Sequence, residues 1–169
     1  MTLEDRIRET LPNWPDQVRR EFLLPYAEDR GWPPSLAADG TPNDEWRGLF
    51  NNRSLQRLQG LSWDLEQIQP VPDVFCMEGV KRLTLMLHGY AITPGNYFTE
   101  QLQKGQGSFE FHVSHIRQAG TPISPPAGIM EPDGLDLIDG WHRTAAYFRC
   151  KGLGLVDDSP LEVHVGRDP

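Results

Sequence analysis

The chain has 169 residues and a formal charge of −8, from 24 acidic and 16 basic side chains, with 38% hydrophobic and 24% charged residues. These values are typical of a globular protein large enough to bury a core, and they disfavour a broad surface for nucleic-acid backbones, which needs clustered Lys and Arg. The chain shows no signal peptide, no apolar run long enough for a bilayer and only two well separated cysteines, so we expect a cytoplasmic protein with free thiols that does not enter a membrane.

The first hundred residues are predicted to be mainly helical. A helix begins with Pro15 at its first position and ends at Gly31, because proline suits the first turn and glycine favours the residue after the last. A second helical stretch begins near Asn43, where Trp, Leu and Phe recur at helical spacing. The segment DLEQIQPVPD (64–73) is predicted to be a break, because two prolines remove backbone donors.

Two more helices are predicted before residue 106. The first runs from Asp73, its N-cap, to Gly89, since apolar residues every three or four positions share one face. The second is short, with Thr93 as cap, Pro94 at its first position and Gly105 as its stop.

The remaining residues alternate strands with one helix. Apolar and polar residues alternate from Phe109 to Val113, which predicts a half-buried strand. A hairpin is predicted around a Pro-Asp-Gly turn that ends at Gly134, then a helix from Trp141, then a strand in the segment LEVHVGR (161–167). We therefore expect an α+β fold, with a helical N-terminal region over residues 1–105 packed on a small mixed sheet-and-helix core over residues 106–169.

Two common catalytic patterns are not met. The stretch LMLHGYAITPG resembles the oxyanion segment of α/β-hydrolases, but the chain has no GxSxG nucleophile. His112 and His115 lie three residues apart where the predicted strand passes into a turn, so their side chains would diverge, and no Cys/His set has the spacing of a zinc site. A structural zinc ion is therefore not expected, whereas a divalent cation that accompanies a nucleotide needs only one or two carboxylates.

The stretch LIDGWHRTAAYF (137–148) is the strongest candidate for a site. It places Asp139 and Gly140 at the end of a strand and begins a helix near Trp141, whose first-turn N–H groups attract anions. His142 and Arg143 lie in that turn, where cations are unfavourable unless an anion is bound. The alternative is structural: Asp139 is only an N-cap, and the two basic side chains face solvent.

This stretch resembles the signature of the ParB/sulfiredoxin superfamily, in which a strand, a turn of the form DGxHR and a helix bind nucleotide phosphate. The matching residues are Asp139, Gly140, His142 and Arg143, and the similarity extends over roughly residues 108–167. Sulfiredoxins have a cysteine where this chain has Trp141, so reduction of sulfinic acids is not expected. Stand-alone members of the superfamily include nucleoside triphosphatases, nucleases, small-molecule kinases and inhibitors carried by plasmids or phages.

The resemblance implies an Mg²⁺-dependent enzyme that binds ATP or another nucleotide and hydrolyses it or a nucleic-acid phosphodiester. His142 and Arg143 would stabilise developing charge, and Asp139 would hold the metal or activate water, with Glu131 and Asp136 as weaker candidates. The phosphate-binding set would be Gly140, Trp141, His142, Arg143 and Thr144.

Two other functions remain open from the sequence. The chain could be a non-catalytic interaction protein of a mobile element, with a protein partner bound through the N-terminal helices, where Trp14, Trp32, Trp46 and Trp63 lie. It could also transfer phosphate from a nucleotide to a small hydroxylated acceptor, as a kinase does. Nucleic acid as a partner is not favoured by the net charge.

Overall fold

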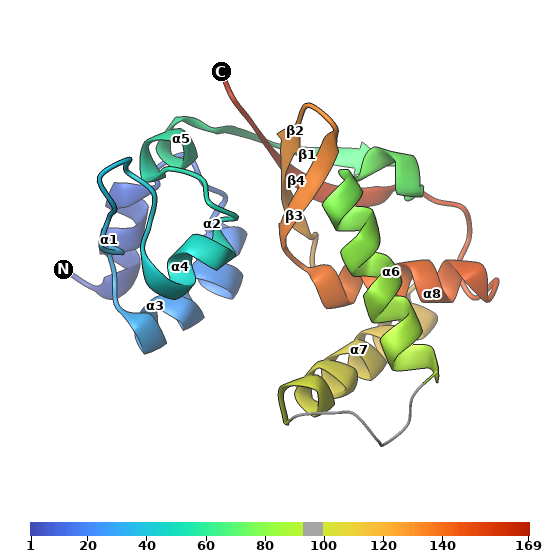
Figure 1. Cartoon of the computed structure of the whole chain (residues 1–169). Helices are drawn as coiled ribbons and strands as arrows, with labels where there is room; N and C mark the ends of the chain where they lie inside the picture. Colours follow the sequence, from blue (N-terminus) through green and yellow to red (C-terminus); the bar gives the residue numbers. More distant parts are fainter. Residues whose placement is uncertain (93–99) are drawn as a thin grey trace. The chain divides into compact units, whose positions relative to one another are not determined.

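The computed structural model describes residues 1–92 and 100–169, and it confirms the expected α+β class, with a four-stranded mixed sheet of order β1-β4-β2-β3 (Figure 1). The chain divides into two compact units, residues 1–64 with 164–169 and residues 65–163. The helices before the sheet are α1 (Leu3–Thr10), α2 (Asp16–Val18), the π-helical η1 (Arg19–Leu23), α3 (Leu24–Arg30), α4 (Asp44–Leu49) and α5 (Leu55–Gly60). The later elements are β1 (Ser62–Ile68), the 3-10 helix η2 (Pro72–Val74), α6 (Met77–Ile92), α7 (Glu100–Ala119), β2 (Ala127–Glu131), β3 (Gly134–Asp139), α8 (Trp141–Gly152) and β4 (Leu161–Arg167).

The first unit opens with a helix that the sequence pattern did not predict. In α1 a capping box fixes the start, because the Thr2 side chain accepts from the N–H of Asp5 while the Asp5 carboxylate accepts from the N–H of Thr2. Most of α1 is charged and exposed, and Ile7 is its buried contact with the core. A single buried position gives no period, which is why the helix was missed.

The predicted helix between Pro15 and Gly31 is confirmed as the continuous run α2, η1 and α3. Pro15 is its N-cap, one residue earlier than expected, and Gly31 ends it with φ +82°. The helix predicted from Asn43 begins there, but it divides into α4 and α5, with Ser54 capping the second through the N–H of Arg57.

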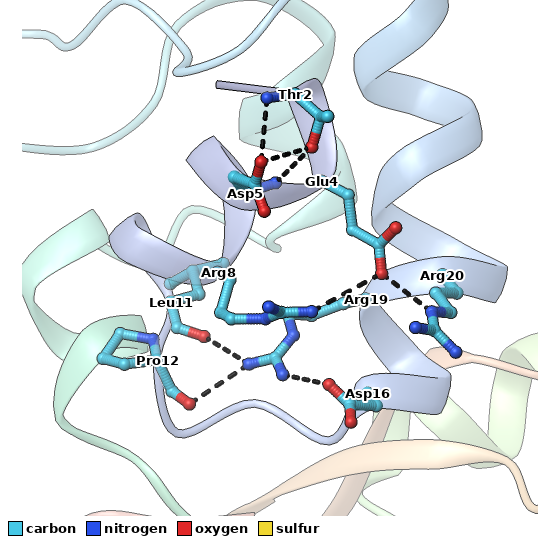
Figure 2. Close-up of polar contacts among 9 residues, drawn as sticks. All are labelled: Thr2, Glu4, Asp5, Arg8, Leu11, Pro12, Asp16, Arg19 and Arg20. Atoms are coloured by element: carbon cyan, nitrogen blue, oxygen red, sulfur yellow. Dashed lines mark hydrogen bonds and ion pairs between the residues drawn. The ribbon is translucent and has the colours of Figure 1, made fainter.

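Arg19 lies inside the first unit, where its guanidinium joins three segments (Figure 2). Its Nη1 donates to the carbonyl oxygens of Leu11 at 3.2 Å and Pro12 at 3.1 Å, and its Nη2 donates to the carboxylate of Asp16. The next residue, Arg20, lies at the surface and pairs with Glu4 at 2.8 Å. Arg19 therefore satisfies carbonyls that follow the end of α1, while Arg20 makes an exposed ion pair.

Aromatic rings form much of the core of this unit. Trp14 lies 5.0 Å from Trp63 and 6.1 Å from Phe50 between ring centroids, and Trp46 lies 5.4 Å from Phe50 and 5.1 Å from Trp32. Of these tryptophans, Trp14, Trp32 and Trp46 are buried. These three side chains hold the unit together and are not exposed to a partner.

The second unit contains the predicted hairpin, which is confirmed. Strands β2 and β3 are antiparallel, with Glu131 opposite Gly134 at the turn and Ala127 opposite Asp139 at the open end. Gly134 has φ +128°, and a Cβ there would lie 2.7 Å from the carbonyl carbon of Phe75, so the turn requires glycine. The final strand is also confirmed as β4.

Strand β1 corrects the prediction of a break over residues 64–73. The strand ends at Ile68, before the first of the two prolines, and η2 contains the second. Only Ile68 is buried in β1, which is an edge strand of the sheet, so its sequence lacks the alternation that marks a half-buried strand. The prolines therefore mark where the strand ends and do not exclude it.

Helices α6 and α7 differ from the elements predicted for these parts of the chain. The predicted helix from Asp73 begins later, as α6 at Met77, and extends beyond Gly89. The strand predicted from Phe109 to Val113 is wrong, because this segment belongs to α7. Phe109 and Ile116 are buried, seven residues apart, whereas Phe111 is 57% exposed.

Helix α7 runs through Gly105 without stopping, so the expected domain boundary at residues 105 and 106 falls inside it. Thr93 and Pro94 lie outside the described residues.

Helix α8 packs against both α6 and α7, and its first turn follows directly from β3 (Figure 1). The thiol of Cys150 donates to the carbonyl of Val113 in α7 at 3.7 Å, which fixes α8 against that helix. Cys76 and Cys150 are both free and buried. The end of β3 and the start of α8 are thus held on a rigid support of sheet and helices.

Candidate functional site

The turn between β3 and α8 has the conformation that the candidate site requires. Gly140 is the N-cap of α8, with φ +84° and ψ +22°, in the left-handed region that favours glycine. A Cβ at this position would lie 2.8 Å from the Cβ of Pro126. The turn therefore needs glycine both for its backbone angles and for its contact with the Pro-rich segment before β2.

Asp139 is not the N-cap of α8, contrary to the structural alternative. Because Gly140 has no side chain, no side-chain acceptor caps this helix, and the first intrahelical bond runs from the N–H of Thr144 to the carbonyl of Gly140 at 2.9 Å. The N–H groups of Trp141, His142 and Arg143 precede that first bond of the helical ladder. These groups, with the positive end of the helix dipole, form a surface suited to an anion.

Arg143 does not face solvent, which also contradicts the structural alternative. The residue is 7% exposed, and its Nη2 donates to Oδ2 of Asp139 at 2.5 Å while its Nη1 donates to the hydroxyl of Ser124. The carboxylate at the end of β3 and the hydroxyl before β2 therefore fix the guanidinium at the first turn of α8. An arginine held in this way is pre-organised for the oxygens of a carboxylate or phosphate, because little side-chain entropy is lost on binding.

A second arginine reaches the same turn from α6. The guanidinium carbon of Arg82 lies 4.4 Å from the centre of the Trp141 ring, in a cation–π contact. His142 is partly buried, and burial followed by the charge of Arg82 lowers the pKa of its imidazole. His142 is thus biased towards its neutral form, and the permanent positive charge here comes from Arg82 and Arg143.

His112 of α7 lies close enough to the turn for the charges of Arg143 and His142 to act on it, and it was not among the residues predicted for the site. Burial, and then the charges of Arg143, His142 and His115, lower the pKa of His112 to about 4. Its Nδ1 is buried and makes no hydrogen bond. The signal was available in the sequence as a histidine three residues before His115, but the strand prediction directed these side chains to opposite faces, whereas a helix places them on one side.

Thr144 lies in the same part of α8 and is fully buried. Its hydroxyl Oγ1 has no hydrogen-bond partner. A helical side chain leans towards the N-terminus of its helix, so we expect this hydroxyl to lie on the side of Thr144 that faces the first turn. The Thr144 hydroxyl and Nδ1 of His112 are two buried polar atoms without a hydrogen-bond partner, on helices α8 and α7, which pack on one another.

The structure does not bring the predicted acidic residues together. Asp139 and Glu131 lie at opposite ends of the β2–β3 hairpin, four residues apart along the register, which corresponds to about 13 Å. Asp136 lies opposite Ile129 in the middle of the hairpin and is buried. Over residues 1–92 and 100–169, no group of three or more His, Cys, Asp or Glu side chains could hold a metal ion. Of the two predicted metal ligands, Asp139 lies at the turn and Glu131 lies at the other end of the hairpin.

Comparison with protein-family models, curated proteins and solved structures gave no match for this chain. No helix within the described ranges has the length and apolarity to span a membrane. The first turn of α8 brings His142 and Arg143 together with Arg82 of α6, and the charges of His142 and Arg143 act on His112 of α7.

Proposed function

We propose that the first turn of α8 binds the phosphate groups of a nucleotide, ATP or another nucleoside triphosphate. The observation that carries the proposal is the guanidinium of Arg143, which is buried and held by Asp139 and Ser124 directly beside a helix N-terminus that no side chain caps. A phosphate at this position would accept from backbone N–H groups and from fixed cationic donors in one place. The resemblance of residues 139–143 to the ParB/sulfiredoxin signature supports a nucleotide over other anions.

Hydrolysis of a phosphoanhydride or phosphodiester bond is the catalytic part of this proposal. Phosphoryl transfer depends mainly on positioning and on charge stabilisation, which Arg143, Arg82 and the amides of α8 would supply. A nucleotide-bound Mg²⁺ takes most of its ligands from phosphate and water, so one carboxylate suffices. Asp139 would contribute through Oδ1, because the bond from Arg143 goes to Oδ2.

Calorimetric titration of ATP, ADP, CTP and inorganic tripolyphosphate tests the binding step. We expect binding to the wild type and at least tenfold weaker binding to His142→Ala and Arg143→Lys, with folding of each variant verified by circular dichroism. Arg149→Ala is the matched control, because Arg149 is an exposed cation on the last turn of the same helix, at the negative end of its dipole. Its affinity should equal that of the wild type.

Two results would overturn the proposal. One is the absence of binding to wild-type protein at millimolar concentrations of all four compounds. The other is an equal affinity of wild type, His142→Ala and Arg143→Lys, which would move the ligand away from α8. Release of inorganic phosphate from ATP with Mg²⁺, measured on the same samples, decides whether binding is accompanied by turnover.

A further inference from the structure

His112 lies on a helix that is separate from the DGxHR turn, yet it belongs to the same cluster of charges. The helices α7 and α8 pack on one another, and the bond from Cys150 to the carbonyl of Val113 fixes the part of α7 next to His112. Arg143 and His142 are close enough for their charges to act on the imidazole. The ring of Phe111 packs edge-on against it, with 5.3 Å between centroids.

The Nδ1 atom of this imidazole is shielded from water and has no hydrogen-bond partner. Leaving a buried polar atom unsatisfied costs about 1–3 kcal/mol, so a group of this kind calls for an explanation in terms of a ligand or a water. The hydroxyl of Thr144, a fully buried residue of α8, also has no hydrogen-bond partner. The two atoms lie on helices that pack on one another, which makes a shared hydrogen-bonding ligand one explanation for both.

We propose that His112 contacts the ligand of this site, with Nδ1–H donating a hydrogen bond to a phosphate oxygen held at the first turn of α8. This inference rests on the proposed function and adds to it a residue of α7 that lies outside the DGxHR sequence. A neutral imidazole donates one hydrogen bond without adding charge, so it complements Arg143, which supplies the charge. The phosphate would thus be enclosed by donors from α7 and α8.

A ligand-binding role and a structural role predict different results for His112→Leu. If Nδ1 serves the ligand alone, leucine removes an unsatisfied polar atom, and the free energy of unfolding at pH 7.5 should stay the same or rise. The affinity for ATP and tripolyphosphate should fall about five- to twentyfold, because one hydrogen bond to an anionic oxygen is lost. A merely structural histidine would lower stability and leave the affinity of the folded protein unchanged.

Two conservative variants identify the atom involved. The amide nitrogen of asparagine occupies approximately the position of Nδ1, whereas that of glutamine reaches the position of Nε2. We therefore expect His112→Asn to bind tripolyphosphate within about threefold of the wild type, and His112→Gln to bind as weakly as His112→Leu. Equal affinities for Asn and Gln variants would refute the assignment of Nδ1.

The outcomes separate this inference from the proposed function. If the wild type binds ATP and tripolyphosphate and Arg143→Lys weakens both, while His112→Leu binds as tightly as the wild type, the role of His112 is refuted and the α8 site stands. If the wild type binds neither compound, the proposed function fails, and the role of His112 fails with it. Loss of affinity in His112→Leu together with unchanged or higher stability supports both.

Discussion

Arg143 and Asp139 form an ion pair across the first turn of α8, in which Nη2 donates to Oδ2 at 2.5 Å and the two side chains are 9% and 21% exposed. The pair links the last residue of β3 to the third residue of the helix. It therefore holds the geometry of the turn at the same time as it fixes the guanidinium for a ligand. Its contribution to stability and its contribution to binding can be separated by experiment.

Breaking this pair should destabilise the protein more than breaking an exposed pair. We expect a double-mutant cycle of Arg143→Met and Asp139→Leu, followed by urea unfolding, to give a coupling energy of about 1–3 kcal/mol, because both groups are largely withdrawn from water. The control is the cycle for Lys151 and Asp158, where the carboxylate is 81% exposed. There the coupling should stay below about 1 kcal/mol. Equal couplings would show that burial does not strengthen the Arg143–Asp139 pair.

Gly140→Ala should be costly for two reasons that a control can separate. Alanine in the left-handed region costs about 1–2 kcal/mol, and its Cβ would in addition collide with Pro126. Gly154 also has a positive φ, of +67°, but a Cβ there meets nothing within 4 Å. We therefore expect Gly140→Ala to lower the free energy of unfolding by about 2–4 kcal/mol and Gly154→Ala by about 1–2 kcal/mol. Equal losses would mean that the contact with Pro126 relaxes freely.

The elements that could be predicted from the sequence are those with a local signal. The Pro-Asp-Gly hairpin, the glycine before α8 and the helix from Pro15 to Gly31 each have a turn or capping residue that acts within a few positions. The strand predicted at Phe109 failed because alternation over five residues also fits a helix with one exposed aromatic ring, and Phe111 is that ring. Only packing against α8 distinguishes the two.

The candidate site was predicted in part for the same reason. Gly140, His142 and Arg143 are contiguous, so a single motif identified them. His112 and Arg82 come from other helices, and their approach to Trp141 and Arg143 depends on tertiary packing that no spacing in the sequence encodes. The pairing of Arg143 with Asp139 was also not predicted. An aspartate between a strand and a helix is typical of an N-cap, and nothing in the sequence indicates that its carboxylate binds an arginine instead.

The neighbouring residues Arg19 and Arg20 provide a matched comparison of buried and exposed arginines. Arg19→Met would leave the carbonyls of Leu11 and Pro12 without their donor, so we expect a loss of about 2–4 kcal/mol in the free energy of unfolding (Figure 2). Arg20→Met removes an ion pair whose arginine is 60% exposed, so its loss should be much smaller than that of Arg19→Met. Chemical denaturation of both variants measures the difference. A similar loss in both would contradict the structural role of Arg19.

The stability of the protein should fall as the pH decreases from about 6.5 to about 4, because of His112. Its pKa is about 4 in the folded protein, against an ordinary value of 6.5, so the unfolded chain binds more protons in this window. The free energy of unfolding is therefore highest above pH 6.5 and is lost as the pH falls through this range. Since the side chain is only half-buried, we expect His112 to account for about 1–2 kcal/mol of this loss. The lowered pKa of His142 acts in the same direction.

The measurement is urea unfolding at intervals between pH 4 and pH 7.5. His112→Leu should flatten the dependence, because the group that takes up a proton on unfolding is gone. The carboxylates of Asp5, Asp16 and Asp39, whose hydrogen bonds lower their pKa, add to the loss only at the acidic end of this window, because the unfolded groups begin to bind protons at about pH 5. An unchanged slope in His112→Leu would show that the imidazole is not shielded beside Arg143, and it would weaken the case for a donor at that position.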